Sequence, residues 1–552
     1  MARSRLVWLI PLVAIGLFLS IALRQLWLPG FYYDEGFDLV PMMALLRGET
    51  PELLRGIGLQ LGGLHLPLMK MDYLGSLTGY VTLPFLAVFG PGVVAARLQP
   101  ITFSCVTIVL AFILARRWFG LRVAALTALL LAVNPSFIWF SRQGITVTST
   151  MTVFSLGSLL ALDVARARGK PRGALIVAGL LAGLGLWAKF VFLWWLALLG
   201  MIGLIWLVAR GRSALMDRLR WACRALPWIA LGFVLGAGPL IAYNLIGLSQ
   251  GVGAPTINLL LGSLTGPTQY GLNNSAFLEN LSKRLADFEV FLNGSYFWYN
   301  GVPYGNVYTL PWLLAAAVLV CALAARQPGG RKILAVLACI LVYLPISSFT
   351  VSGLWATHIF VLLPLPQLIM AAAAVWLAEA VVPRLALAWR NAAVLGLAFA
   401  LLALPFARDL WVSEQHHATL ARTGGSGRFS DAIYTLADWL KARGAARPVA
   451  LDWGIQANLE VVSGGAVRPT EAHFFSGDAS DAFKAEVRGL LADPDRLYVV
   501  LWSGDATARG FAVFDHRAQF EALAREVGRT PREVFVASER GGLPVYVVLQ
   551  AR

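Results

Sequence analysis

Eleven apolar runs dominate the sequence and restrict what it can fold into. They cover residues 6–28, 98–116, 122–140, 147–165, 173–188, 190–209, 225–246, 308–325, 332–350, 356–381 and 391–407. A helix of about 20 apolar residues is long enough to cross the hydrocarbon core of a bilayer. Only 14% of the residues are charged, against about 25% in soluble proteins. We therefore predict a polytopic α-helical membrane protein whose first run is an uncleaved span.

Basic residues gather in every second short connection between these runs. They are Arg3/Arg5, Arg116/Arg117/Arg122, Arg166/Arg168/Lys170/Arg172, Arg210/Arg212/Arg218/Arg220/Arg224, Arg326/Arg331/Lys332 and Arg384/Arg390. Because Lys and Arg collect in cytoplasmic loops, we expect a cytoplasmic N-terminus in the cytoplasmic (inner) membrane. The loops 29–97 and 247–307 and the C-terminal tail then face outward. The net charge of +15 follows from this topology, and no basic run with interleaved aromatics indicates a nucleic-acid partner.

The first outer loop contains two apolar segments that we do not count as spans. A crossing at 73–90 would invert every later loop and turn the basic connections outward. We predict an interfacial helix there and a second one at 37–47, where apolar residues follow helical spacing.

The composition changes after Arg408, where charged residues become frequent and strand-like runs alternate with helical ones. We predict helices at 430–443, 455–462, 481–491 and 515–526, and strands at 447–452, 497–502, 533–538 and 544–549. This pattern indicates a soluble extracytoplasmic α/β domain at 408–552, following a transmembrane domain at 1–407. Asp452-Trp453-Gly454 ends a predicted strand, a place where ligands bind to sheets, but we favour a simple turn.

Three carboxylates, Asp34, Glu35 and Asp38, lie within five residues directly after the first span. Two interpretations are open. Carboxylates stabilise a helix N-terminus, so the cluster fits a solvated cap on the first interfacial helix. A carboxylate at the outer membrane surface also fits a general base that deprotonates an acceptor hydroxyl.

Four candidate phosphate ligands lie in or beside the outer connections, and they are Lys70, Arg142, Lys189 and His358. Sugar transfer from a lipid-phosphate donor needs such groups, because cations stabilise the leaving phosphate. An inverting displacement then needs one carboxylate base. The alternative is that Lys and Arg extend toward the interface from helix ends and that His358 is an ordinary buried histidine.

Several short motifs resemble a known family when they are taken in order. They are Tyr33-Asp34-Glu35, Ala95-Ala96-Arg97-Leu98, Leu114-Ala115-Arg116-Arg117-Trp118-Phe119-Gly120, Asn134-Pro135 to Ser141-Arg142, Gly179-Leu180-Leu181-Ala182-Gly183-Leu184-Gly185 to Lys189, and His358 through Leu363-Pro364-Leu365-Pro366. Over residues 6–400 the chain is similar to the integral-membrane GT-C glycosyltransferases. It most resembles the branch that holds the protein O-mannosyltransferases and the lipid A aminoarabinose transferase.

The resemblance implies a polyprenyl-phosphate sugar donor, outer-side transfer of a hexose or pentose, and inversion. It assigns the base to Asp34, with Glu35 as its acidic partner, and places Lys70 near the donor phosphate. The prolines expected beside that lysine are replaced by Met71-Asp72-Tyr73. Some relatives use a divalent metal ion near the acidic loop, so such an ion is a further expectation.

The acceptor stays open, because a protein, a lipid or a glycan hydroxyl would each fit. Two rival function classes also stay open. A transporter or flippase of a lipid-linked substrate would keep ionisable residues near the bilayer midplane and show paired broken helices, whereas the acids and cations here lie near the ends of the runs. A structural membrane subunit would use its tail to bind a partner.

Overall fold

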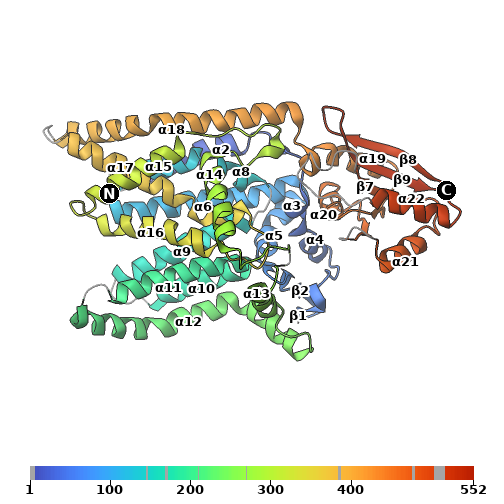
Figure 1. Cartoon of the computed structure of the whole chain (residues 1–552), viewed down its shortest axis with the longest axis horizontal. Coiled ribbons are helices and arrows are strands. Elements are labelled where there is room, and N and C mark those ends of the chain that lie inside the picture. Colours follow the sequence, from blue (N-terminus) through green and yellow to red (C-terminus); the bar gives the residue numbers. More distant parts are fainter. Residues whose placement is uncertain are drawn as a thin grey trace.

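The computed structural model describes residues 7–143, 147–167, 172–208, 211–268, 270–382, 387–474, 479–502 and 516–552. Its helices form an elongated bundle, and the C-terminal domain lies at one end of that bundle (Figure 1). The N-terminal end of the chain lies at the opposite end (Figure 1).

Every predicted apolar run contains a helix. These helices are α2 (Leu9–Ala22), α6 (Val93–Phe119), α7 (Leu121–Val133) with α8 (Pro135–Arg142), α9 (Val147–Ala167), α10 (Arg172–Ala188), α11 (Leu193–Val208), α12 (Gly211–Ser249), α15 (Thr309–Leu323), α16 (Gly330–Ile346), α17 (Pro364–Val381) and α18 (Leu387–Thr423). Among the described residues, six helices are long and apolar enough to cross a membrane. The pair α7 and α8, bent by 57°, makes a seventh span if it is counted as one. The chain is therefore a multi-pass membrane protein.

The bend between α7 and α8 has a local cause. Pro135 supplies no backbone N–H and cannot continue α7, but it fits the first position of a new helix. The Asn134 side chain accepts a hydrogen bond from Phe137 N at 3.0 Å and caps α8. This break places Arg142 at the end of a short second segment.

The basic connections that were predicted to share one side contact one another. Arg117 pairs with Asp163 at 2.6 Å, and the Lys332 ammonium lies 5.8 Å from the Trp118 ring centroid. These contacts join the connection after α6 to those before α10 and α16. They agree with the alternation of basic and charge-poor loops.

The loop 29–97 is more structured than its sequence indicates. It contains α3 (Tyr33–Phe37), α4 (Val40–Leu46), η1 (Leu54–Gly56), the hairpins β1 (Gly58–Leu61) with β2 (Leu64–Pro67) and β3 (Met69–Met71) with β4 (Leu74–Gly75), and α5 (Leu77–Phe89). The helices α4 and α5 occupy the two segments predicted to be interfacial. The strands were not predicted, because they are only two to four residues long.

The loop 247–307 and the segments before α11 and α17 contain further helices. The loop 247–307 contains α13 (Pro255–Thr265), α14 (Phe277–Asn293) and η3 (Trp298–Asn300). The turns η2 (Phe190–Phe192) and η4 (Ala356–Leu362) precede α11 and α17. Lys189 is the residue before η2, so it separates α10 from α11 as the sequence predicted.

The C-terminal domain is built on a five-stranded sheet in the order β6 (Thr470–Glu471), β5 (Val449–Ala450), β7 (Leu497–Leu501), β9 (Pro544–Ala551) and β8 (Pro531–Ser538). Strands β6, β5 and β7 are parallel, whereas β9 is antiparallel to both β7 and β8. The remaining elements are η5 (Gly427–Phe429), α19 (Ala432–Ala442), α20 (Gln456–Val462), α21 (Asp481–Leu490) and α22 (His516–Glu526). The predicted helices and strands are all present, but the strand expected at 447–452 is only two residues long, and β6 was not predicted. The predicted start of the last helix, residue 515, lies outside the described residues.

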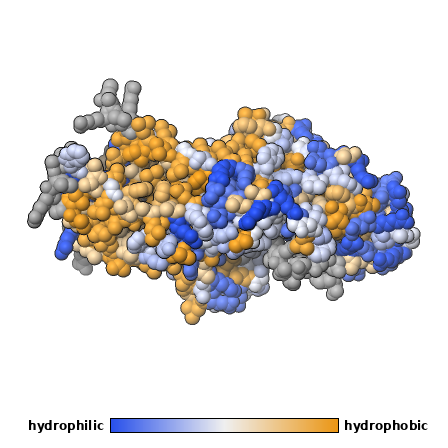
Figure 2. All heavy atoms as spheres, turned by 90° about the horizontal axis from the view of Figure 1, so that it is seen from above, coloured by the Kyte–Doolittle hydropathy of each residue, from blue (hydrophilic) through white to orange (hydrophobic). Residues whose placement is uncertain are grey.

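The acidic loop is packed between the bundle and this domain. The predicted boundary at 408 falls inside α18, which continues to Thr423. Phe31, Leu39 and Met42 of the loop share one buried core with residues of α19 and of the sheet. Figure 2 shows an apolar surface over the bundle half and a more polar surface over the C-terminal half.

Candidate functional site

The three carboxylates of the loop lie on or beside the short helix α3, but they have different surroundings. Glu35 and Asp38 are buried, whereas Asp34 is half-buried. Tyr32 N donates to Glu35 Oε1 at 3.2 Å, which satisfies a backbone donor at the start of α3. Glu35 therefore caps α3, whereas Asp34 lies in a different, less buried environment.

Glu35 forms a two-point ion pair with Arg97 near the start of α6. Arg97 Nε lies 2.8 Å from Glu35 Oε2, and Nη2 lies 2.8 Å from Oε1. Both side chains are fully buried. Arg97 also donates to Leu26 O at 2.7 Å and to Pro29 O at 3.0 Å. This geometry ties the acidic loop to the first and second spans.

Asp38 is paired with Lys70 of β3 at 3.0 Å, and both side chains are buried. The Lys70 ammonium also donates to Phe37 O and lies 4.5 Å from the Phe37 ring centroid. Lys70 is therefore held against the end of α3. Its charge neutralises Asp38 within the loop.

Asp34 lies close enough to Lys189 for the two charges to interact. Burial raises the pKa of Asp34 to about 6, the Lys189 ammonium opposes this shift, and the Asp38 and Glu35 charges add to it. Burial lowers the pKa of Lys189 to about 8, and Asp34 and Asp38 oppose that shift. Near neutral pH the pair is thus a carboxylate and an ammonium, each close to its titration.

Arg142 is fully buried at the end of α8. Its Nη2 donates to Arg24 O at 2.6 Å and to Gln25 O at 2.7 Å, and the guanidinium lies 4.6 Å from the Trp139 ring centroid. Within the described part of the chain, its Nε and Nη1 have no hydrogen-bond partner. Arg142 therefore supports the turn after α2 and keeps two unused donors.

His358 lies in η4 and is 1% exposed. Neither ring nitrogen has a hydrogen-bond partner among the described residues. A buried imidazolium without a partner is costly, so the ring is neutral here. The side chain lies close enough to Lys189 to interact with its charge, and it can serve as a neutral hydrogen-bonding group rather than as a cation.

The part of the chain that the structure describes contains no suitable set of ligands for the expected divalent metal ion. No group of three or more His, Cys, Asp or Glu side chains there is arranged to hold a metal ion. Glu35 and Asp38 are each neutralised by a protein cation. The described residues do not fit a metal centre, and no step below is routed through one.

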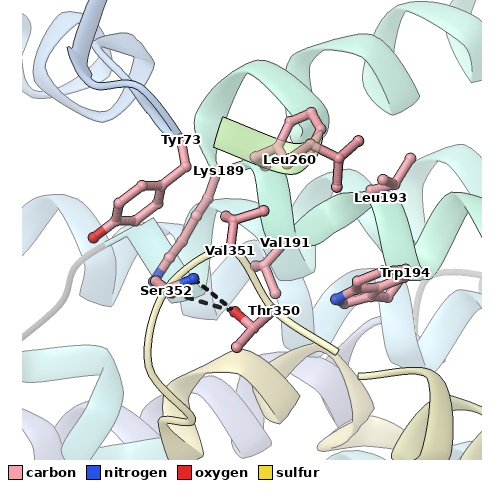
Figure 3. A pocket seen from close by; sticks show the side chains of 10 residues that line it. Tyr73, Lys189, Val191, Leu193, Trp194, Leu260, Thr350, Val351 and Ser352 are labelled. Carbon is pink, nitrogen blue, oxygen red and sulfur yellow. Dashed lines mark hydrogen bonds between the residues drawn. The ribbon is translucent and has the colours of Figure 1, made fainter. Parts of the chain in front are cut away.

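Lys189 also lines a small hollow. The wall is mostly apolar, with Leu193 and Trp194 of α11, Leu260 of α13 and Val351 beside η4. Figure 3 shows the Lys189 side chain extending from the Tyr73 side of this hollow toward Ser352. Ser352 N donates to Thr350 Oγ1 at 3.2 Å, which fixes the loop on that side. The hollow thus joins an apolar wall to a cation that interacts with Asp34.

The C-terminal domain closes over α3. A Cβ added to Gly36 would lie 2.8 Å from Ala457 O, so only glycine allows this approach. The Tyr33 and Trp453 rings are 4.6 Å apart. The segment Asp452-Trp453-Gly454 is a turn, as predicted, and its Asp452 pairs with His516 at 2.6 Å.

Two residues near the acids were not selected from the sequence. Arg97 was quoted within a motif but was given no role, although a lone arginine at the start of an apolar run is a signal for a buried ion pair. Arg428 interacts electrostatically with Asp34, yet it lies 394 positions later in the chain. No local pattern could have connected the two.

Comparison with known proteins supports the same family. A sequence model described as dolichyl-phosphate-mannose-protein mannosyltransferase matches residues 76–235. That stretch contains Arg97, Arg142 and Lys189 but not Asp34. No curated protein matches the chain as a relative.

Solved structures share the fold over nearly the whole chain. The apo structure of ArnT from Cupriavidus metallidurans is 14% identical, with a TM-score of 0.56, over 99% of this chain and 98% of ArnT. The same protein bound to undecaprenyl phosphate gives a TM-score of 0.55. An oligosaccharyltransferase from Archaeoglobus fulgidus is 14% identical, with a TM-score of 0.50, over 96% of this chain and 69% of its own. These likenesses confirm the predicted GT-C fold.

Proposed function

We propose that this GT-C membrane protein is an inverting glycosyltransferase that moves a sugar from a polyprenyl-phosphate donor to an acceptor hydroxyl. We further propose that transfer takes place on the outer side of the cytoplasmic membrane. The observation that carries the proposal is the environment of Asp34. Asp34 is the half-buried one of the three loop carboxylates, and its pKa is raised. Glu35 and Asp38 are neutralised by their own cations.

In the proposed reaction, Asp34 accepts the proton of the acceptor hydroxyl as the oxygen attacks the anomeric carbon. The bond from that carbon to the polyprenyl-phosphate oxygen breaks, and the phosphate leaves with the electron pair. One displacement inverts the anomeric configuration. A carboxylate with a pKa of about 6 is a stronger base than an ordinary aspartate and is still ionised near pH 7.

Lys189 is the cation best placed to receive the donor phosphate. It lies between Asp34 and the apolar hollow beside α11, so a phosphate there would extend its lipid along the hollow wall. The ArnT structure bound to undecaprenyl phosphate supports a donor of this lipid class. Arg142 and His358 would contribute hydrogen bonds after a local opening, and Lys70 would act through Asp38.

The decisive experiment is transfer of labelled sugar in purified membranes, with a panel of polyprenyl-phosphate hexoses and pentoses as donors. We expect one donor to label a protein, lipid or glycan acceptor with inverted configuration. Loss of lipid from one leaflet without any labelled product would favour a transporter or flippase instead.

The rate of transfer should show a bell-shaped dependence on pH. Below pH 6 protonation of Asp34 removes the base, so the rate should fall about tenfold per pH unit. Above pH 8 the ammonium of Lys189 loses its proton, and donor binding should weaken. Steady-state rates from pH 4.5 to 9.5 at fixed ionic strength test this. A rate that does not change between pH 4.5 and 6 would exclude Asp34 as the base.

Replacing Lys189 by glutamine should raise the KM for the donor by about ten- to a hundredfold, because a charge-assisted contact is worth about 1.5–3 kcal/mol. Measurement at pH 7.5 keeps Asp34 ionised. Lys283 pairs with Glu279 on exposed α14, so Lys283→Gln is the matched control and should not change KM. An unchanged donor KM in Lys189→Gln would remove this residue from the phosphate site.

A further inference from the structure

The segment that joins α18 to the C-terminal domain packs against the acidic loop. The Phe429 ring stacks between Tyr32, with centroids 4.0 Å apart, and Tyr299, with centroids 3.9 Å apart. The two interplanar angles are 13° and 8°. Tyr32 directly precedes α3, so this stack fixes η5 against the start of the helix that carries Asp34.

Backbone hydrogen bonds hold the same segment at both ends. Gly30 N donates to Gly424 O at 3.3 Å, and Ser426 N donates to Tyr299 O at 2.8 Å. Gly427 N donates to Glu539 Oε1 at 2.7 Å. The segment therefore contacts the loop, η3 and the C-terminal domain together, which leaves little freedom to the residue between Gly427 and Phe429.

That residue is Arg428, and its guanidinium lies beside the acidic helix. The centre of the guanidinium is 5.6 Å from the Trp453 ring centroid, and Trp453 contacts Tyr33. A Cβ built on Gly454 would lie 3.5 Å from Arg428 Nη1 and 3.7 Å from Tyr33 Cβ. Arg428 also interacts electrostatically with both Tyr32 and Asp34.

We propose that Arg428 is a positioning residue that places a positive charge beside the helix that carries Asp34. The stack of Phe429 between Tyr32 and Tyr299 fixes its place. This inference rests on the proposed function. It makes the C-terminal part of the chain a component of the catalytic centre, although Asp34 belongs to the first loop. Lys189 then provides positive charge from the bundle, and Arg428 provides it from the C-terminal side.

Other charged groups around Asp34 also interact with its carboxylate. They are the carboxylates Glu35 and Asp38 and the cations Lys70, Lys189 and Arg428. The phenols Tyr73 and Tyr296 also interact with Asp34, and burial raises the pKa of both. Glu35, Asp38 and Lys70 are each committed to an ion pair of their own.

The test compares Arg428→Gln, Arg428→Lys and Arg422→Gln, since Arg422 is an exposed residue at the end of α18. Removing a nearby opposite charge raises the pKa of a carboxyl. We therefore expect the acid limb of the rate profile to move upward in Arg428→Gln by up to about 1 pH unit, a loss of about two- to fivefold at pH 6. At pH 8 the rates should match, Arg428→Lys should restore most of the profile, and Arg422→Gln should leave it unchanged.

A second measurement does not need transfer activity. Carbodiimides modify protonated carboxyls, so the extent of Asp34 labelling, read by peptide mass spectrometry on the full-length protein in detergent, should fall as the pH rises. The midpoint should move upward in Arg428→Gln by the same amount. Equal losses of rate at every pH with an unchanged labelling midpoint would overturn the proposal. If no donor supports transfer, the labelling midpoint still decides the role of Arg428.

Discussion

Replacing Asp34 by asparagine should reduce sugar transfer by about 10²- to 10⁴-fold, the range that loss of a general base produces. Asparagine has nearly the same shape but cannot accept the hydroxyl proton. Asp34 is half-buried, and among the residues that the structure describes it forms no ion pair comparable to that of Glu35. We therefore expect normal extraction, chromatography and thermal unfolding from the variant, with initial rates of labelled-sugar transfer as the measurement.

A measurement of donor binding separates loss of the base from loss of the phosphate site. Asparagine removes a negative charge near Lys189, so the donor phosphate should bind at least as tightly as in the native protein. Loss of turnover with retained donor binding would contrast with Lys189→Gln, where donor binding is weakened. Glu52, an exposed carboxylate of the same loop, supplies the control variant Glu52→Gln. A near-native rate in Asp34→Asn would refute the assignment.

The fold was largely predictable because its signals are local. Each membrane helix follows from an apolar run. The alternation of basic connections grouped Arg117 with Lys332, and the structure places Lys332 over the ring of Trp118, which is next to Arg117. The amphipathic pattern also located the helices of the C-terminal domain. The short strands β1 to β4 could not be predicted, because two to four residues carry no periodicity.

The candidate site was only partly predictable because its pairings are long-range. The sequence selected Asp34, Glu35, Lys70 and Lys189, and the structure places them around one loop. The sequence alone could not show that Glu35 pairs with Arg97 or that Asp38 pairs with Lys70. It also could not show that residues after 423 cover α3. These contacts join segments far apart in the chain, and each depends on tertiary packing rather than on propensity.

Breaking the Glu35–Arg97 pair should have the largest effect on stability. Both side chains are fully buried, and Arg97 also holds two backbone carbonyls. Removing one partner of a buried pair costs about 3–5 kcal/mol. Arg97→Met should thus lower the temperature of aggregation on heating in detergent. The exposed pair Arg24–Glu414, at 2.6 Å with side chains 46% and 55% exposed, is the control, and Arg24→Met should cost about 1 kcal/mol or less.

The same pair separates a positioning role for Glu35 from a catalytic one. The double variant Glu35→Gln/Arg97→Met should be less destabilised than the sum of the single variants, because no charge is left buried alone. In the folded fraction of Glu35→Gln, loss of a neighbouring negative charge should lower the pKa of Asp34, so the acid limb should move to lower pH. If Glu35 were the base, that limb would disappear with it. A retained and shifted limb therefore identifies Glu35 as the residue that holds the loop and Asp34 as the group that takes the proton.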